Sequence, residues 1–411
     1  MTTPTRFSAG SAHQAPPLRG LRPPALRGLR VLDFTIVMSG PMCTRLMADA
    51  GADVVKVESP QGDVVRHREP IIAGTSTYYA SMNCGKRSIV IDLQSPEGRA
   101  LAFDLAMRAD VLVENFRPGV MAKLGLTYEA LEAVNPRLIF ASISGFGQTG
   151  PRSHAPAYAP VIHAASGYES AFNSYQPGSP RPSNNGIFIA DVMGASYAFG
   201  AIQMALFERE RSGRGQAIDV SLMDSVLGML IYEIQAAQFP PERPRQVYEP
   251  VRAKDGWVMV SAVTQKNLET LFEVIGHPDG KTDPRFATVA EKEAHWRDLL
   301  GLIETWTSQR SAESCEQLLM AAGVPCSRYR SVSEAMDDPQ LAQRGFFSNI
   351  HLGDGSFRVA NSPALFSATP TRAQPVVATL GQHTHAVLEE WLDLPAPQVE
   401  GLRASGALGP R

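Results

Sequence analysis

In the first 143 residues, the apolar positions follow a strand-like pattern in some segments and helical spacing in others. Short apolar runs of strand length are separated by segments with helical spacing and by turns containing Gly and Pro. The pattern predicts helices at residues 42–50, 97–108 and 120–124, and strands at 29–34, 52–58, 88–93, 110–114 and 137–143. Strand, helix, strand with short connections is the unit of a parallel sheet. The expected fold class is therefore α/β.

Ligands of open parallel sheets gather at the carboxyl ends of the strands. In this chain those ends fall at residues 35–39, 58–63, 115–117 and 144–147. We expect the side chains of a binding site to come from these four segments.

A second pattern surrounds Asp191. It is the first polar residue of a segment rich in Ala, Gly and apolar residues, which keeps helical spacing up to a basic last turn and Gly213. One interpretation is a helix N-cap, because Asp accepts backbone N–H bonds there and the helix dipole favours its charge. The other is a nucleophile, because a carboxylate held at a helix N-terminus stays ionised between apolar walls and can attack an activated carbonyl. Gly194 and Gly200 indicate close approach of a neighbouring helix or a ligand, since a mid-helix Gly costs about 1 kcal/mol relative to Ala.

The remaining pattern divides the chain into domains. A predicted strand at 217–221 leads into an apolar helix at 223–237, and the Pro-rich stretch 240–244 follows it. Residues 247–330 have their own strand at 256–261 and their own helices, and a last helix is expected near 385–392. We predict five segments: a disordered tail at 1–27, the N-terminal part of a large Rossmann-like domain at 28–224, a linker at 225–246, a smaller α+β domain at 247–330, and a linker that returns to the large domain at 331–411.

Composition excludes several classes of protein. A net charge of −3 gives no support to a nucleic-acid or membrane-surface partner, and no run of eighteen or more apolar residues appears. Four scattered cysteines without a CxxC pair favour free thiols in a reducing compartment, and hence a cytoplasmic protein. The Arg-rich, acid-free start permits a mitochondrial address, but its five prolines would break the amphipathic helix that such an address needs.

Motifs for the commonest cofactors are also missing. Neither GxGxxG nor GxxxxGK[ST] occurs, which weakens nicotinamide and P-loop interpretations. HExxH and GxSxG are missing too, and no set of residues has the spacing of a metal site. We therefore expect no metal and no tightly bound cofactor.

Ten short motifs occur in an order and at a spacing that resemble the class III coenzyme A transferases (CaiB/BaiF family). The resemblance runs from about Leu26 to Leu392. Each motif is weak alone, and the signal comes from their succession: VLDFT (31–35), SGP (39–41), GADVVKVE (51–58), GD (62–63) with Arg66, NCGKRSI (83–89), VENFRPG (113–119), NPRLI (135–139), SGFGQTGP (144–151), GRGQ (213–216) and LGQHT (380–384). Asp191 lies between SGFGQTGP and GRGQ.

The resemblance implies an activity and an assembly. Asp191 matches the family's catalytic nucleophile, which attacks an acyl-CoA thioester and passes through anhydride and aspartyl-CoA thioester intermediates. Coenzyme A is then a substrate, and its acceptor is a free carboxylic acid. The family pattern also implies an interlocked homodimer, with residues 223–244 as the crossing linker.

The resemblance further implies which residues contact CoA. Arg117 is a cation suited to the CoA phosphates, and Ser59 replaces a basic residue that reaches a CoA phosphate in some relatives. For Lys86 and Lys123 the plainer interpretation is a solvated charge, and for Phe116 it is core packing. Gly145 and Gly147 are candidate oxyanion donors. The substrate-pocket candidates are Gly145, Phe146, Tyr158 and His163, and the matching CoA-contact positions are Met38, Ser39, Met82, Asn83, Gly85, Lys86, Asn115, Phe116, Lys123 and Ser144.

Two alternative functions stay open. The α-methylacyl-CoA racemases resemble this chain at most of the same motifs, but racemisation needs a second acid/base, and Tyr158 holds the position where a His is expected. A phenol, with a pKa of about 10, is a poor base for that task. His154 and His163 lie nearby in sequence, so a racemase or epimerase is the first alternative. A non-catalytic CoA-binding paralogue, in which Asp191 is only a cap, is the second.

The acid is expected to be a small dicarboxylic acid. Formyl-CoA and oxalate members of the family carry a Gly-rich loop that closes over the aspartate, and no such run appears between Gln238 and Gly256. Succinate, mesaconate, itaconate or another small dicarboxylate remain as candidates. Candidate cations for the carboxylate are Arg181, Arg243, Arg245 and Arg252, each with a solvated surface position as the plainer interpretation.

Overall fold

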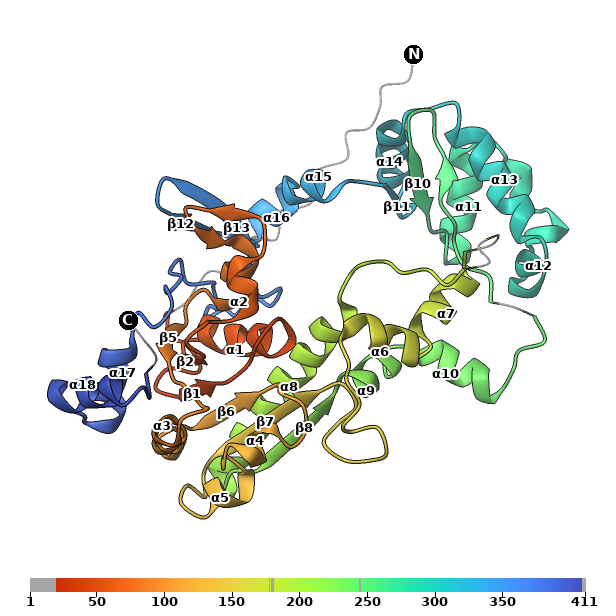
Figure 1. Cartoon of the computed structure of the whole chain (residues 1–411). Helices are drawn as coiled ribbons and strands as arrows, with labels where there is room; N and C mark the ends of the chain where they lie inside the picture. Colours follow the sequence, from red (N-terminus) through yellow and green to blue (C-terminus); the bar gives the residue numbers. More distant parts are fainter. Residues whose placement is uncertain (1–19, 177, 179–180, 244, 409–411) are drawn as a thin grey trace. The chain divides into compact units, whose positions relative to one another are not determined.

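The structure is a computed structural model that describes residues 20–176, 178, 181–243 and 245–408. Two compact units make up the chain (Figure 1). The first comprises the described residues up to Ile234 together with those from Gln340 onward, and the second is Gln235–Pro339.

A six-stranded parallel sheet forms the centre of the first unit (Figure 1). Its spatial order is β5 (Arg87–Val90), β2 (Asp53–Glu58), β1 (Arg30–Asp33), β6 (Val111–Glu114), β7 (Ile139–Ser144) and β8 (Ala217–Ser221). The chain runs outward from β1 through β2 to β5, then returns to the other side of β1 and continues through β6, β7 and β8. Strand order therefore reverses between β1 and β6, and such a switch point is where open parallel sheets bind ligands. The predicted α/β fold with a parallel sheet is confirmed.

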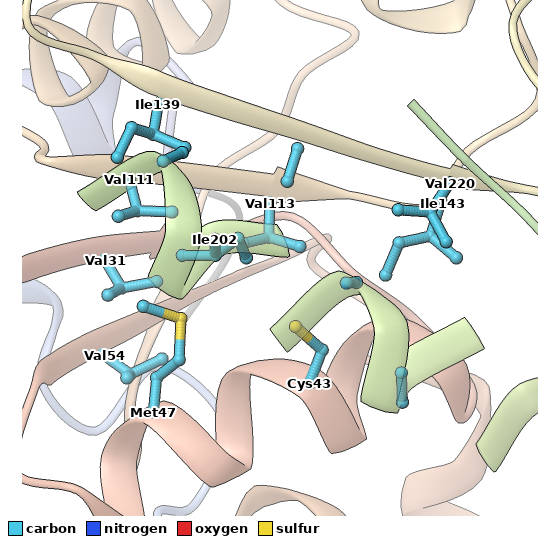
Figure 2. Packing of buried hydrophobic residues seen from close by; sticks show 14 of the residues in the cluster. Val31, Cys43, Met47, Val54, Val111, Val113, Ile139, Ile143, Ile202 and Val220 are labelled. Carbon is cyan, nitrogen blue, oxygen red and sulfur yellow. The ribbon is translucent and has the colours of Figure 1, made fainter. Parts of the chain in front are cut away.

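Helices cover both faces of this sheet. Successive residues of a strand point to opposite faces, so each strand contributes side chains to both layers. Val31 packs with α1 (Ser39–Asp49) and α8 (Ile189–Ser212), and Figure 2 shows Met47 and Cys43 of α1 beside Ile202 of α8 and the strand valines. Leu32 belongs to the opposite layer, which contains α3 (Pro96–Met107), α5 (Tyr128–Glu132), α17 (Thr384–Leu392) and α18 (Ala396–Ala404). Burial on both faces explains why the strands are nearly continuous apolar runs.

Shorter elements complete the first unit. They are η1 (Val64–His67), β3 (Ile71–Ile72), β4 (Thr75–Ser76), α2 (Thr77–Asn83), α4 (Val120–Lys123), α6 (Ala159–Ala165), α7 (Tyr168–Ser174), α9 (Leu222–Leu227) and the antiparallel hairpin β12 (Phe347–Leu352) with β13 (Gly355–Ala360). Helices α10 (Ile231–Gln238) and α16 (Pro339–Gln343) cross the boundaries between the two units.

The second unit has its own sheet and its own core. Strands β11 (Cys326–Arg328), β10 (Trp257–Val260) and β9 (Val251–Arg252) pair antiparallel in that order. The core includes Phe272, Trp296 and Trp306, and the predicted small domain at 247–330 lies inside this unit. Its helical elements are α11 (Gln265–Val274), η2 (Pro278–Lys281), η3 (Pro284–Phe286), α12 (Val289–Ala294), α13 (Trp296–Thr307), α14 (Ala312–Ala321) and α15 (Val332–Met336).

Two expectations differ from the structure. The predicted helix at 223–237 is two helices, α9 and α10, because the chain turns at Gly228, a residue with low helix propensity. The predicted tail at 1–27 falls mostly on residues outside the described part, but residues 20–27 are described. Within them Leu26 is buried in the core and its N–H donates to the Ala50 carbonyl at 2.9 Å, so order begins before residue 28.

Among the described residues, one helix, α8, is long and apolar enough to cross a membrane by length and composition alone. It packs into the core of the first unit through Ala190, Ala195, Ala198 and Ile202. Near its end, the buried Arg209 pairs with Asp110 at 3.1 Å. These contacts identify α8 as a partly buried core helix.

Candidate active site

A cavity of about 720 Å³ lies at the switch point of the sheet. Its walls come from the loops after β1, β6 and β7, from η1 and α2, and from the start of α8. The lining residues are Ile36, Val37, Met38, Ser39, Val64, Val65, Arg68, Tyr78, Asn115, Phe116, Arg117, Pro118, Val120, Ile143, Ser144, Gly145, Ser153, Ala155, Ala157, Tyr158, Ala159, Pro160, Phe188, Asp191 and Leu222. Three of the four strand-end segments predicted to form a site therefore contribute to it.

Asp191 is the single carboxylate among these lining residues. It is the third residue of α8, which begins at Ile189, and the N-cap position is Phe188. Within the part of the chain that the structure describes, no side chain caps this helix. The interpretation of Asp191 as an N-cap is therefore wrong, because the helix starts one turn earlier than the polar pattern indicated.

The carboxylate of Asp191 is largely removed from water. Burial raises the pKa of Asp191 to about 6, and hydrogen bonds from the side chain and backbone of Ser39 oppose that rise. At neutral pH the group is mostly ionised but weakly solvated. Such a carboxylate is more reactive toward an electrophilic carbonyl than one surrounded by water.

Ser39 is held in place by the loop before it. It is the first residue of α1, so its N–H has no partner within the helix and is free to point at an anion. The Asn115 amide exchanges two hydrogen bonds of 2.8 Å with the backbone of Ile36, and it lies 3.4 Å from the Ser39 hydroxyl. The end of β6 thus fixes the group that contacts Asp191.

Buried charges hold the same loop from the other side. The ammonium of Lys56 donates to the Thr35 carbonyl at 2.6 Å and pairs with Asp63 at 3.1 Å. The Asp63 carboxylate accepts from the N–H of Val37, whose φ of 68° is a left-handed conformation rare for a β-branched residue. The charges of Lys56 and Asp63 therefore stabilise a strained wall of the cavity.

The two glycines of α8 have different surroundings. A Cβ atom at Gly194 would lie 2.3 Å from the side chain of Leu222, so α9 provides the close approach predicted there. At Gly200 no atom of the described chain lies within 4 Å of such a Cβ. The described residues therefore do not make the close approach predicted at Gly200.

The structure brings together about half of the residues predicted to bind substrate. Met38, Ser39, Asn115, Phe116, Arg117, Ser144, Gly145 and Tyr158 line the cavity. The hydroxyl oxygen of Ser144 is buried without a hydrogen-bond partner in the described part of the chain, which indicates that a ligand group completes it. The predicted residues outside the lining are Met82, Asn83, Gly85, Lys86, Lys123, Phe146 and His163.

Lys86 has a structural environment. Its buried ammonium lies 3.0 Å from Asp33 and also donates to the Pro41 carbonyl at 2.9 Å and the Asn83 amide oxygen at 2.8 Å. Burial lowers the pKa of Lys86 to about 8, against the opposing influence of Asp33. With its three donors occupied, Lys86 gives no support to a phosphate contact or to a solvated surface charge.

His163 supports α8 and does not face the cavity. Its Nε2 accepts the N–H of Ala190 at 3.1 Å, so the second ring nitrogen, 3.9 Å from Glu169, carries the proton in this arrangement. Burial lowers the pKa of His163. This imidazole holds the first turn of the helix that carries Asp191, and its acceptor nitrogen is already in use.

Tyr78 and Arg68 are two of the lining residues that sequence analysis missed. The Tyr78 hydroxyl lies 3.4 Å from the Met38 sulfur, next to Ser39. The guanidinium carbon of Arg68 lies 5.6 Å from the centroid of the Tyr78 ring. Arg68 directly follows the short η1, and Tyr78 lies in the first turn of the seven-residue helix α2; the apolar pattern predicts neither element. By contrast, Arg181 does not line the cavity, and Arg243, Arg245 and Arg252 belong to the second unit.

Comparison with known proteins identifies the family. Residues 26–384 match CoA-transferase family III. An acetyl-CoA:oxalate CoA-transferase of Acetobacter aceti is 35% identical over 83% of this chain and 88% of that protein. A succinate–glutarate CoA-transferase of Agrobacterium fabrum is 34% identical over 90% of this chain and 96% of that protein.

A solved structure agrees in fold. The crystal structure of a CAIB/BAIF family protein from Brucella suis superposes with a TM-score of 0.78 at 31% identity, over 90% of this chain and all of that one. This chain belongs to CoA-transferase family III, and it is a CoA-transferase that acts between acyl-CoA thioesters and carboxylic acids.

Proposed function

We propose that this protein moves coenzyme A from an acyl-CoA to a short dicarboxylic acid, with Asp191 as the nucleophile. The observation that carries the proposal is the single, largely buried carboxylate in the lining of the cavity at the switch point. The resemblance to the family supports the same choice, because Asp191 matches the position of the family's nucleophile.

The reaction needs no oxidant and no net proton transfer. A carboxylate oxygen of Asp191 attacks the thioester carbon, the C–S bond breaks, and CoA leaves as a thiolate whose pKa is roughly 8 to 9. The thiolate attacks the aspartyl carbon of the mixed anhydride, which releases the first acid and leaves an aspartyl-CoA thioester. The incoming carboxylate attacks that thioester and forms a second anhydride. Thiolate attack on the new acyl carbon gives the product acyl-CoA and frees Asp191.

Groups for stabilising these intermediates lie beside the nucleophile. The Ser39 N–H and hydroxyl already bond the carboxylate and are placed to stabilise charge on its oxygens. The unpaired Ser144 hydroxyl and the backbone of Gly145 lie in the same lining. Phe116 offers an apolar face to CoA, and the exposed Arg117 offers a cation to its phosphates.

The acid class is supported by two observations. The printed names of the relatives pair CoA with oxalate, succinate and glutarate, all of which are dicarboxylates. The cavity itself contains two arginines, more cationic charge than one carboxylate nucleophile balances. The test is a panel of acyl-CoA donors incubated with free acids, with product masses as the readout. Formation of a dicarboxylyl-CoA supports the proposal, and transfer to none of the acids contradicts it.

The pH dependence follows from the burial of Asp191. Only the ionised carboxylate attacks, so kcat/KM for the acyl-CoA donor is expected to fall as pH drops below about 6 and to level off above it. Replacing Ser39 with Ala removes a hydrogen bond that lowers this pKa, so the inflection should move to higher pH. The measurement is initial rate against pH for both proteins. An unchanged inflection in Ser39→Ala would contradict the assigned contact.

The racemase alternative gains no support from the site. His163 is turned away and engaged with α8, His154 is exposed outside the lining, and Tyr158 is the remaining candidate base. A 2-methylacyl-CoA incubated with the protein in deuterated water should therefore keep its α-proton. Incorporation of deuterium at the α-carbon would establish the racemase function instead.

We further propose a cytoplasmic homodimer. Helix α8 exposes an apolar stripe made by Tyr197 (50% exposed), Met204 (69%) and Phe207 (63%), on the same side as the unfilled space at Gly200. One-turn spacing of such residues is typical of a helix face that packs on a protein. A second copy of the chain is the occupant that the family pattern implies. A monomeric mass under native conditions would contradict it.

A further inference from the structure

The cavity has two arginines, and they lie on different walls. Arg117 follows β6 and also lines a second cavity of about 360 Å³, together with Glu114 and Asp219. Arg68 follows η1, beside Val64 and Val65, and does not line that second cavity. The two cations are therefore positioned to contact different parts of a bound substrate.

Arg68 is exposed, and none of the described carboxylates neutralises its charge. The contrast with Arg66, two residues earlier, is direct: that guanidinium is buried against Glu58 at 2.6 Å and also donates to Tyr79 at 2.6 Å. Within the described residues no carboxylate forms an ion pair with Arg68, whose side chain instead lies beside Tyr78. Arg66 is used by the fold, and Arg68 remains available to a ligand.

Tyr78 connects Arg68 to the reacting centre. Its ring contacts the guanidinium, and its hydroxyl reaches Met38, the neighbour of Ser39, which bonds Asp191. Burial raises the pKa of Tyr78, the Arg68 charge opposes this rise, and the Asp191 charge adds to it, so Tyr78 lies within electrostatic reach of both groups. Arg68 and the nucleophile Asp191 therefore both act on the same tyrosine.

We propose that Arg68 is the specificity residue for the acid, and that its guanidinium binds the remote carboxylate of a short dicarboxylic acid while the other carboxylate reacts at Asp191. This inference rests on the proposed transferase function. A planar guanidinium binds a carboxylate through two parallel hydrogen bonds, and the apolar wall of Val64, Val65 and Phe188 strengthens such a pair. A monocarboxylic acid of equal length leaves the cation unpaired.

The test compares acids that differ only in the second carboxylate: succinate with butyrate, and glutarate with pentanoate. Because the donor and acceptor half-reactions are separate, kcat/KM for the acid at fixed acyl-CoA reports on the half-reaction that consumes the acid. Arg68→Gln should lower kcat/KM for the dicarboxylates about 100-fold, mainly through KM, and leave that for the monocarboxylates within about threefold. Arg68→Lys, which keeps the charge but not the two-bond geometry, should recover part of the loss. The control Arg27→Gln alters an exposed arginine outside the cavity, and it should leave kcat/KM unchanged for both the dicarboxylates and the monocarboxylates.

Three results would overturn the assignment while leaving the transferase function intact. One is an equal decrease in kcat/KM of Arg68→Gln for dicarboxylic and monocarboxylic acids, which would mean that Arg68 has a structural role. Another is an increase in KM for acyl-CoA alone, which would assign Arg68 to a CoA phosphate. The third is a wild-type protein that prefers monocarboxylic acids. Transfer by the wild-type protein to none of the acids contradicts the proposed function itself.

Discussion

Replacing Asp191 with Asn is expected to abolish CoA transfer and, at pH 8, to make the protein more stable. Loss of a nucleophile typically lowers kcat by a factor of about 1,000 or more. The gain in stability has a separate cause. Burial has raised the pKa of Asp191 from 3.8 to about 6. At neutral pH the folded state therefore contains a poorly solvated negative charge, and a neutral side chain at this position is expected to be more favourable. A shift of this size corresponds to roughly 1–3 kcal/mol.

The stability difference between wild type and Asp191→Asn is expected to depend on pH. A carboxyl with a raised folded pKa destabilises the folded state fully above about pH 6 and not at all below the unfolded value of 3.8. Unfolding in urea should therefore show Asp191→Asn more stable at pH 8 and the difference shrinking toward pH 4. Asp354→Asn, in the exposed turn of the β12–β13 hairpin, is the matched control and should show no such trend.

These two readouts separate the functions considered for this chain. A non-catalytic CoA-binding paralogue predicts no transfer in either protein. Retained transfer in Asp191→Asn would reject Asp191 as nucleophile. Lower stability at pH 8 would reject the burial argument.

Replacing Lys86 with Met is expected to destabilise the protein by about 3–5 kcal/mol, because it leaves a buried carboxylate without its main partner. Asp33 is fully buried; burial raises its pKa, but the charges of Lys86 and Lys56, with hydrogen bonds from Thr35 and Thr44, hold it below the usual value. Removing Lys86 takes away the ammonium 3.0 Å from that carboxylate. The measurement is the free energy of unfolding in urea at pH 7.

Lys123→Met is the matched control, since Lys123 is exposed and is also a predicted CoA contact. Its stability is expected to stay within about 0.5 kcal/mol of the wild-type value. A Lys86→Met protein that is as stable as wild type but binds CoA more weakly would restore the prediction made from the motifs. That outcome would mean that Lys86 leaves Asp33 and contacts CoA when CoA binds.

The parallel sheet could be predicted because its strands are buried on both faces and interrupted by clear turns. Each predicted strand from 29–34 to 137–143 matches an observed strand within a few residues. The β12–β13 hairpin was missed because its exposed and half-buried residues do not form an apolar run. The break between α9 and α10 was missed because the apolar pattern continues across Gly228.

The site could be predicted only where chemistry and strand ends coincide. Asp191, Ser39, Asn115 and Ser144 follow from motifs at the ends of strands or the start of a helix. Lys86 shows the limit of that reasoning, because a basic residue beside a motif can be paired with a buried acid such as Asp33 from a distant strand. Arg68 and Tyr78 escape notice because their importance depends on how η1 and α2 pack against the loop after β1.

The central claim is that Asp191 becomes covalently acylated and then thioesterified by CoA. The most direct measurement is to incubate the protein with acyl-CoA and hydroxylamine and to analyse its peptides by mass spectrometry. The account predicts a hydroxamate on Asp191 that appears only when acyl-CoA is present. Continued CoA transfer with an unmodified Asp191 peptide would contradict it.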